Sequence, residues 1–379
     1  MGSKRQAVLL VIDGLGDLPT LALSGQTPLE AADTPWLSLL AARGRYGQVD
    51  PVGRGIVPNT HSGTGLLFGV PSGQTGRIRR GPVEASGAGR KLEPGDIALR
   101  ANFATLERRA DTLLVTDRRA GRIEQDTTDL AAELADVDLG DGVSASLQPT
   151  DQHRAVLVLT GPGLDEAVSD TDPGDSGGSD RLEPCRPLRP RAARTAGTVN
   201  EFVHRAHRLL EAHPVNARRI REGSLPANGI ITRGAGAAFE VDNVLHARGI
   251  DTAVVAGCNT VLGLARVLGF ETITDPRFTA APDTDLDAKR QAALTALDHH
   301  QLVYLHIKAP DLFSHDRDPA GKRRFLERVD RSLQGLQDHG AVIAVTADHS
   351  TDSNTGAHTD DPVPSLIHAP DTDTAADRA

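Results

Sequence analysis

Carboxylate and imidazole side chains follow apolar runs at several widely separated places in the sequence. In chain order, these side chains are Asp13, Asp311, His315, Asp348, His349 and His358. Carboxylate oxygens and imidazole nitrogens suit divalent metal ions, Mn²⁺ or Zn²⁺ most readily, with Mg²⁺ as a further option. An acid directly after a strand also fits the N-cap of the next helix, and any one of these acids taken alone has that simpler interpretation. Because the acids share a position at predicted strand ends, we interpret the set as a two-metal site.

The apolar runs that precede these acids predict the elements that position them. A short apolar run without polar alternation is typical of a strand covered on both faces, as in the parallel sheets of α/β proteins. Ligands bind at the carboxyl ends of such strands. We expect strands of this type at residues 8–12, 229–232, 252–256, 302–307 and 341–347, with helices at 285–298 and 322–337. This alternation predicts an α/β fold with a doubly wound, mostly parallel sheet.

The middle of the chain has a different character, because its segments are shorter and its apolar residues alternate with polar ones. This pattern predicts a smaller α+β cap domain inserted into the sheet domain. The expected boundaries place the cap at residues 72–195 and the core at residues 1–71 and 196–379. Within the cap, the glycine- and serine-rich segment 174–180 is expected to form a flexible loop, and the tail from Ala369 is expected to fray.

A glycine-rich segment at residues 55–69 supplies three hydroxyl groups, on Thr60, Ser62 and Thr64, together with the imidazole of His61. A hydroxyl bound to a metal ion has a lowered pKa, which makes it a nucleophile at neutral pH. The same residues also fit a serine- and threonine-rich helix cap. The spacing alone does not choose among the three hydroxyls.

Several arginines could bind an anionic substrate, although a run of charges is more often a solvated face. Phosphoryl transfer leaves the protein little beyond alignment and electrostatic stabilisation, so a few arginines near the metal ions would suffice. Other chemistry is disfavoured, because the chain has no phosphate-binding GxxxxGK[ST] loop and no complete dinucleotide fingerprint. The candidate arginines are Arg77, Arg79, Arg80, Arg100, Arg118, Arg119 and Arg122.

Net charge, apolar content and cysteine spacing restrict the kinds of molecule that the protein is expected to bind. The net charge of −10 argues against nonspecific nucleic-acid binding, which requires a basic surface. No apolar stretch approaches the roughly 20 residues that span a membrane, and no secretory leader is recognisable at the start. Cys185 and Cys258 are far apart and form no metal-binding pair. We therefore expect a cytoplasmic enzyme acting on a small metabolite, with its oligomeric state left open.

Short motifs along most of the chain occur in an order that identifies a family. They are DGLGD at 13–17, TPLEAA at 27–32, RGPVEA at 80–85, GDIALRANFAT at 95–105, DRRAGR at 117–122, DTDP at 170–173, KAPD at 308–311 and DHST at 348–351. In this order they resemble the archaeal-type, 2,3-bisphosphoglycerate-independent phosphoglycerate mutases of the alkaline phosphatase superfamily. Each motif is weak by itself, and the specificity comes from the order of the set.

The resemblance implies a role for each matched position. Asp13, Asp348 and His349 would hold one metal ion together with the nucleophile, which falls on Thr60 with His61 beside it. The second ion would be held by Asp311, His315 and His358. The family transfers phosphate from the substrate to the hydroxyl and back to the neighbouring oxygen of the same molecule. The substrate contacts implied for the cap, with Arg80 added from the arginine cluster, are Arg80, Arg100, Asn102, Asp117, Arg118 and Arg122.

The nucleophile loop departs from the family pattern. Where the family carries serine, an acid, threonine, a small residue and histidine, this chain has Thr60, His61, Ser62, Gly63 and Thr64. The first hypothesis is therefore phosphoryl transfer through a phosphothreonine on a small phosphorylated acid. The alternatives are a phosphohydrolase of the same fold, acting on a specialised phosphorylated or phosphonate metabolite, and an inactive relative that binds a phosphometabolite.

Overall fold

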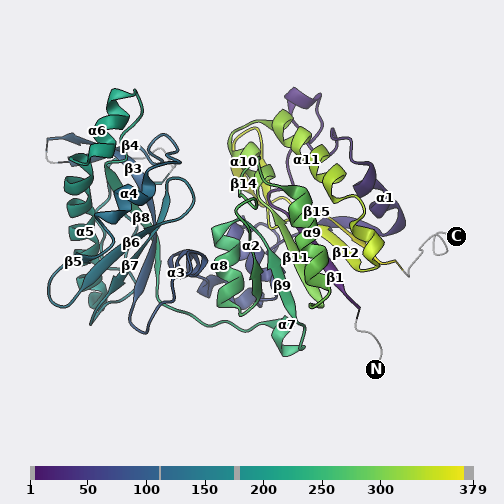
Figure 1. Cartoon of the computed structure of the whole chain (residues 1–379), viewed down its shortest axis with the longest axis horizontal. Helices are drawn as coiled ribbons and strands as arrows, with labels where there is room; N and C mark the ends of the chain where they lie inside the picture. The colour runs from purple at the N-terminus through teal and green to yellow at the C-terminus, as the bar shows by residue number, and fades with distance from the viewer. Residues whose placement is uncertain (1–4, 111, 175–179, 371–379) are drawn as a thin grey trace. The chain divides into compact units, whose positions relative to one another are not determined.

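The structure is a computed structural model that describes residues 5–110, 112–174 and 180–370 (Figure 1). It divides into two compact units. The first unit is formed by Met1–Ile78 with Val241–Ala379, and the second by Arg79–Glu240. Most of the loop expected at residues 174–180 and nearly all of the expected frayed tail lie outside the described residues.

The first unit is built, in the described part of the chain, on a seven-stranded sheet in the order β10-β9-β11-β1-β12-β15-β2. The five strands from β10 to β12 are parallel, and β15 and β2 add an antiparallel edge. This arrangement confirms the α/β fold with a mostly parallel sheet. The strands are β1 (Ala7–Ile12), β2 (Arg45–Val49), β9 (Thr252–Val255), β10 (Glu271–Ile273), β11 (Leu302–Ile307), β12 (Val342–Thr346) and β15 (Val363–His368).

Helices cover both faces of this sheet, as the continuous apolar runs require. On one face, Val303 and Leu305 of β11 pack in a core with side chains of α1 (Pro35–Arg43), α9 (Leu286–Leu297) and α11 (Pro319–Leu333). Tyr304 points to the opposite face, where its ring lies 4.7 Å from that of Phe68. Phe68 is the C-cap of α2 (Thr60–Leu67), which packs against α8 (Asn259–Val267). The remaining elements are η1 (Leu21–Leu23), η2 (Ser72–Arg77), α7 (Val244–Ala247), α10 (Ala309–His315), η4 (Leu336–His339), β13 (Ser350–Asp352) and β14 (Ala357–Thr359).

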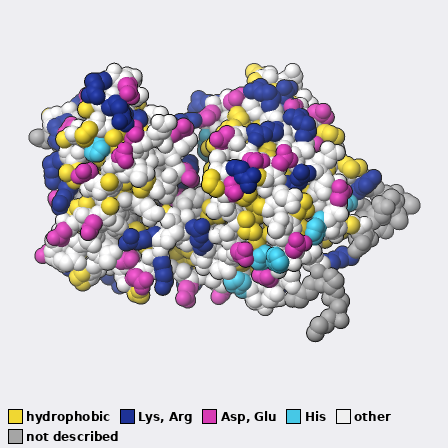
Figure 2. Space-filling model, in the orientation of Figure 1, with side chains coloured by type: hydrophobic (Ala, Val, Ile, Leu, Met, Phe, Trp, Pro, Cys, Tyr) yellow, Lys and Arg dark blue, Asp and Glu magenta, His cyan; other side chains and the backbone are white. Residues whose placement is uncertain are grey.

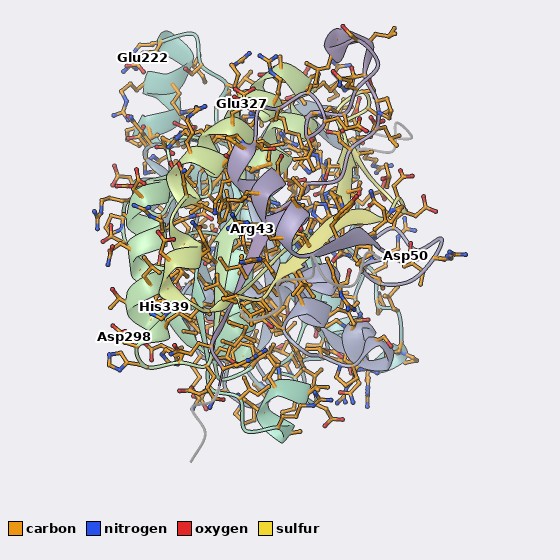
Figure 3. The ribbon with its side chains drawn as sticks, turned by 90° about the vertical axis from the view of Figure 1, so that its right-hand side faces the viewer. Arg43, Asp50, Glu222, Asp298, Glu327 and His339 are labelled. Atoms are coloured by element: carbon orange, nitrogen blue, oxygen red, sulfur yellow. The ribbon has the colours of Figure 1, made fainter. Side chains whose placement is uncertain are left out.

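The parallel strands begin at one edge of the first unit and end at the other. Asp298 and His339, which precede β11 and β12, appear at the same end of the unit in Figure 3. The registers agree, because Ile12 of β1 is level with Ile307 of β11, and Val11 with Thr346 of β12. The residues that follow these three strands therefore emerge side by side.

The second unit is an antiparallel sheet in the order β4-β3-β7-β6-β5, with β8 also paired to β3. Along β3, Leu99 and Phe103 pack against α5 residues such as Phe202, whereas Ala98 lies in a small cluster with Ala85 of α3. Helices thus cover both faces of this sheet too. Its elements are α3 (Arg80–Gly87), β3 (Ile97–Arg109), β4 (Thr112–Asp117), α4 (Thr127–Ala132), β5 (Val137–Asp138), β6 (Ser144–Pro149), β7 (Arg154–Thr160), η3 (Pro190–Ala192), α5 (Ala193–Glu211), α6 (Pro214–Arg221) and β8 (Gly229–Gly236).

The predicted division of the chain differs from the observed one. The strand expected in the parallel sheet at 229–232 is part of β8, which pairs antiparallel with β3 of the second unit. Consequently the second unit extends to Glu240 instead of ending at residue 195, and it begins at Arg79 instead of residue 72. The physical reason is that β8 is covered on both faces, by α3 and α5. A doubly covered antiparallel strand has the same apolar run as a parallel one.

Two surface properties bear on the expected partners. No helix in the described part of the chain is both long enough and apolar enough to cross a membrane. Figure 2 shows Lys and Arg side chains interspersed with Asp and Glu side chains over the visible face of each unit. The absence of a nucleic-acid partner remains a prediction.

Candidate metal centre

The ends of β1, β11 and β12 bring the predicted acids together in the first unit. Asp13 follows β1 directly, and its backbone N–H donates to the Ile307 carbonyl at the end of β11. Asp311 lies four residues beyond Ile307, in the first turn of α10, and Asp348 lies two residues beyond the end of β12. All three carboxylates are buried. Their convergence follows from the shared registers of three neighbouring parallel strands.

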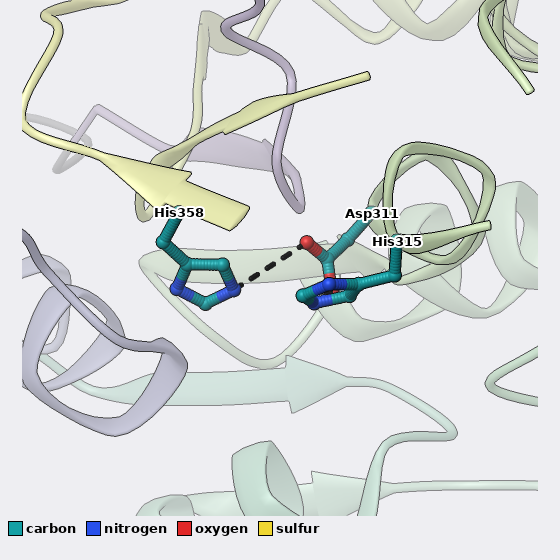
Figure 4. Close-up of side chains that lie close together, drawn as sticks. All are labelled: Asp311, His315 and His358. Carbon is teal, nitrogen blue, oxygen red and sulfur yellow. Dashed lines mark ion pairs between the residues drawn. The ribbon is translucent and has the colours of Figure 1, made fainter. Parts of the chain in front are cut away.

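Two groups of potential ligands form where these acids meet. In each group, one ligand atom per residue lies within 4.8 Å of the others. The first group is Asp13, Asp348 and His349, and the second is Asp311, His315 and His358. Figure 4 shows the second group, with the Nε2 atom of His358 at 3.7 Å from an Asp311 oxygen. Geometry alone thus sorts the six residues into the two sets that the resemblance implies.

Lys308 lies between the two groups. Its Nζ atom donates to Asp13 at 2.8 Å and to Asp311 at 2.6 Å, and it lies 3.5 Å from the Thr60 hydroxyl. Burial alone would lower the pKa of this ammonium, but the Asp13 and Asp311 carboxylates raise the pKa above its usual value. Lys308 therefore carries a fixed positive charge beside both ligand groups.

The three acids experience different electrostatic environments. Burial raises the pKa of Asp348 to about 6, and the neighbouring Asp13 carboxylate adds to that rise. Burial also favours a higher pKa for Asp13 and Asp311. The Lys308 ammonium and hydrogen bonds from histidines outweigh burial and lower the pKa of both groups. The site thus concentrates more negative charge than one lysine neutralises.

The histidines of the second group have their ring nitrogens assigned by their partners. The Nδ1–H of His315 donates to the Gly356 carbonyl at 2.7 Å, and that of His358 to the Pro58 carbonyl at 3.0 Å. Because a carbonyl oxygen only accepts, Nδ1 carries the proton in both rings, and Nε2 is left to face Asp311. This arrangement is the usual one for metal-binding histidines.

The donor set fits divalent ions. The first group offers two carboxylates and one imidazole, and the second offers one carboxylate and two imidazoles, all of which are ligands for Mn²⁺ and Zn²⁺. One oxygen of Asp348, Oδ2, is buried and has no hydrogen-bond partner within the residues that the structure describes. A buried carboxylate oxygen without a partner is costly, and a bound cation would remove that cost.

Thr60 begins α2 at the edge of both groups. Its hydroxyl lies 3.4 Å from Nε2 of His349. The other two candidate hydroxyls are placed differently, because Ser62 Oγ donates to the Asn59 carbonyl within the capping box, and Thr64 is buried inside the helix. His61 lies next to Thr60 on α2 and is partly buried. Among the three hydroxyls, that of Thr60 lies beside the candidate ligands.

Gly63 allows α2 to approach the Asp348 segment closely. A Cβ at this position would lie 2.1 Å from the Asp348 carbonyl oxygen, so Gly63→Ala must displace the helix that carries Thr60. A displacement of about 1 Å can lower activity about 100-fold, and we expect a loss of that order in steady-state turnover. The matched control is Gly65→Ala in the same helix, whose Cβ would lie 2.6 Å from the terminal Cδ1 of the Ile78 side chain and 3.8 Å from Leu264 Cδ2, and would meet no backbone atom at short distance. Equal turnover in the two variants would contradict this role for Gly63.

The predicted substrate contacts lie in the second unit, and four of them lie in two sets of hydrogen bonds and ion pairs, here called together the arginine network. Arg100 is buried and pairs with Glu84 at 3.1 Å, and Glu84 also lies 3.8 Å from Arg80. Asn102 donates to the Arg118 carbonyl at 3.2 Å. Burial and then the charge of Arg80 lower the pKa of the Arg100 guanidinium.

Arg118 belongs to the second set, which is built around Asp172. It forms two hydrogen bonds of 2.7 Å with the Asp172 carboxylate, and Arg233 lies 3.8 Å from the same carboxylate. The remaining two predicted contacts are not joined to the network by these interactions. Asp117 accepts backbone N–H groups of the turn that follows β4, and Arg122 is exposed. The structure therefore gathers Arg80, Arg100, Asn102 and Arg118 around two buried acids.

Sequence reasoning missed several residues of these sites. Lys308 directly follows β11, so its place at the same strand edge was a usable signal. His306 lies inside β11 and reaches Asp13 at 3.0 Å, but nothing in an apolar run marks such a residue. Arg233 lies in β8, which was expected in the other domain.

A buried ion pair between Asp17 and Lys322 was also missed. Both side chains are at most 1% exposed, and Lys322 Nζ lies 2.7 Å from the Asp17 carboxylate. Asp17 further accepts hydrogen bonds from Ser353 and, at 3.4 Å, from Ser314. One carboxylate thus joins the loop after β1, α10 and the segment after β13. No spacing rule in the sequence indicates this convergence.

Comparison with known proteins finds relatives that match nearly the whole chain. Residues 41–216 match the family model described as 2,3-bisphosphoglycerate-independent phosphoglycerate mutase. The enzyme of that name from Methanopyrus kandleri is 42% identical over 98% of this chain and 89% of the relative. Its counterpart in Ignicoccus hospitalis is 40% identical over 96% of this chain and 88% of the relative.

Solved structures give the same result. A protein from Pyrococcus horikoshii superposes with a TM-score of 0.77 and is 32% identical, covering 97% of this chain and 88% of that one. The cofactor-independent phosphoglycerate mutase from Thermoplasma acidophilum superposes with a TM-score of 0.60 at 30% identity, covering 97% and 90%. These similarities extend over almost the whole chain and include both units.

Proposed function

Because the chain belongs to the 2,3-bisphosphoglycerate-independent phosphoglycerate mutase family and is an enzyme of the phosphomutase kind, we propose that it transfers a phosphoryl group through Thr60 with two divalent metal ions. The observation that carries this proposal is the position of the Thr60 hydroxyl, 3.4 Å from His349 and 3.5 Å from Lys308. The proposed substrate is a small phosphorylated acid, with phosphoglycerate as the first choice.

The two ligand groups would hold the ions, with Mn²⁺ or Zn²⁺ as the preferred identities and Mg²⁺ as the third. Bound ions would lower the pKa of the nucleophilic hydroxyl and neutralise charge on the phosphoryl oxygens. The first ion would be held by Asp13, Asp348 and His349 with Thr60, and the second by Asp311, His315 and His358.

The chain's own residues supply the rest of the proposed reaction. Thr60 Oγ1 forms a bond to phosphorus while the bond from phosphorus to the substrate oxygen breaks, and the hydroxyl proton of Thr60 passes to that oxygen, which leaves a phosphothreonine and the free hydroxy acid. The second step returns the phosphoryl group to the neighbouring oxygen of the same molecule. In this second transfer the receiving hydroxyl gives up its proton and Thr60 regains one. Lys308 points its ammonium at Thr60 and so stabilises negative charge on the hydroxyl oxygen and on the incoming phosphoryl group.

We assign binding of the anionic substrate to the arginine network of the second unit. Arginine binds carboxylate and phosphate through paired hydrogen bonds, and the network holds Arg80 and Arg100 on Glu84 and Arg118 on Asp172. Asn102 adds an amide whose Oδ1 atom is buried and has no partner in the described part of the chain. Asp117 and Arg122 remain predicted contacts.

The test is a product assay with 3-phosphoglycerate and Mn²⁺, in which 2-phosphoglycerate and free phosphate are measured separately. We expect 2-phosphoglycerate as the product and loss of activity after chelation, with recovery when Mn²⁺ is restored. Free phosphate as the main product would favour the phosphohydrolase alternative. That alternative has one observation in its favour, because buried Thr64 occupies the place where the family pattern has a histidine.

A further inference from the structure

One hydroxyl contacts both candidate ligand groups. The side chain of Thr351, in β13, is fully buried between them. Its Oγ1 atom lies 3.0 Å from Nδ1 of His349, which belongs to the first group, and 2.8 Å from Oδ1 of Asp311, which belongs to the second. In the pairing of β13 with β14, Thr351 also lies directly opposite His358.

The direction of the two hydrogen bonds follows from the partners. The Asp311 carboxylate, with the Lys308 ammonium at 2.6 Å, is an acceptor only, so the single hydroxyl proton of Thr351 is donated to it. The Thr351 oxygen must then accept the bond from His349, which places a proton on Nδ1. The Nε2 atom of His349 is thereby left facing Asp13 at 3.3 Å and Asp348 at 3.4 Å.

His349 differs in this respect from the histidines of the second group. His315 and His358 donate their Nδ1–H to backbone carbonyls, and a side-chain substitution at the accepting residue does not remove such a carbonyl. The corresponding bond of His349 depends on a side chain that is also attached to the other group. The two groups are therefore linked by a chain of hydrogen bonds from His349 through Thr351 to Asp311.

The backbone of Gly14 packs closely against the hydrogen bond between Thr351 and Asp311. A Cβ at Gly14 would lie 2.9 Å from Thr351 Oγ1 and 3.0 Å from Asp311 Cβ, and its φ of +62° is in the left-handed region that favours glycine. The loop after β1 thus packs directly on the bond between Thr351 and Asp311. Side chains so confined keep one orientation.

We propose that Thr351 is a positioning residue that couples the two metal sites, because one hydroxyl fixes the tautomer of His349 and the orientation of Asp311. The inference rests on the proposed function, since it assumes that the two groups hold divalent ions. It adds that the affinities at the two sites are not independent. Loss of the Thr351 hydroxyl must weaken both.

The experiment measures Mn²⁺ binding to the full-length protein by competition with a chromophoric chelator, without reference to turnover. Thr351→Val keeps the shape of the side chain and removes the hydroxyl, and we expect about 10- to 100-fold weaker binding at both sites. Thr351→Ser restores the hydroxyl and should restore both affinities to nearly the wild-type values. The control is Thr346→Val, which removes another buried hydroxyl, bonded to Ser365 at 2.7 Å. It should bind Mn²⁺ as the wild type does.

The possible outcomes separate this inference from the proposed function. Wild-type protein that binds no Mn²⁺ would overturn both. Wild-type protein that binds two ions, with unchanged affinity in Thr351→Val or with only one site weakened, would overturn the coupling and leave the proposed function intact. If Thr351→Val fails to fold, Thr351→Ala and Thr351→Ser are compared instead. Equal Mn²⁺ affinities in that pair would contradict the proposal, and weaker binding by the alanine variant at both sites would support it.

Discussion

Thr60→Ala is expected to abolish phosphoryl transfer while leaving the metal content nearly unchanged. The variant loses the nucleophilic oxygen, and removal of a nucleophile lowers turnover by at least about 10⁴-fold in comparable enzymes. The candidate ligand groups keep all six of their carboxylate and imidazole side chains. Turnover with 3-phosphoglycerate and elemental analysis of the same preparation measure the two effects together.

Conservative and neighbouring variants identify the nucleophile. Thr60→Ser retains a hydroxyl at the same position and should retain measurable turnover. Ser62→Ala removes the hydrogen bond from the Asn59 N–H to Ser62 Oγ, but leaves the N-cap bond from the Ser62 N–H to Asn59 Oδ1 and the Thr60 hydroxyl in place. Undiminished activity in Thr60→Ala would transfer the role of nucleophile to Ser62 or Thr64.

Asp311→Asn and Asp348→Asn are each expected to lose one metal ion and nearly all activity. The change removes a negative charge from one ligand group with little change of shape. Elemental analysis after dialysis should therefore show about two ions per chain in the wild type and about one in each variant. We expect turnover to fall by at least about 10³-fold in both, because electrostatic stabilisation of the transferred group is lost.

The two variants differ in their electrostatic neighbours, which gives the experiment a second readout. Within the described residues, Lys308 forms ion pairs with Asp311 and Asp13 but not with Asp348. Asp311→Asn therefore removes a partner of the buried Lys308 ammonium and should also lower the thermal stability measured in the presence of chelator. Asp348→Asn instead removes a buried negative charge that lies near the Asp13 carboxylate, so it should not lower the thermal stability in the same way. Full retention of two ions in either variant would contradict the assignment of that ligand group.

Much of the fold was predictable from the apolar runs. The strands β1, β9, β11 and β12 were expected within one or two residues of their observed bounds, because a doubly covered strand must be apolar throughout. Helix α11 begins earlier and ends earlier than expected. Asp318 caps its start, with Pro319 as the first residue, and Gly335, at a φ of +90°, follows its end. These local signals were present in the sequence but were outweighed by periodicity.

The division between the units was not predictable in the same way. The run at 229–232 has the pattern of a central parallel strand, and only its pairing with β3 places β8 in the second sheet. Pairing partners are set by contacts between residues far apart in the chain, and burial erases the polar alternation that would have marked an antiparallel strand. Arg233, which lies in β8 near Asp172, was therefore not included among the arginines of the second unit.

The sequence by itself determined which acids and histidines are available at the carboxyl ends of the parallel strands, because strand ends and residue types are both local properties. The tertiary structure decided which of them share a group, which hydroxyl lies beside them, and that Lys308, His306 and Thr351 lie among them. The reason is that these contacts depend on the register of neighbouring strands and on the packing of α2 and of the β13–β14 hairpin over their ends. Most of these contacts join segments far apart in the chain, so no local sequence pattern indicates them.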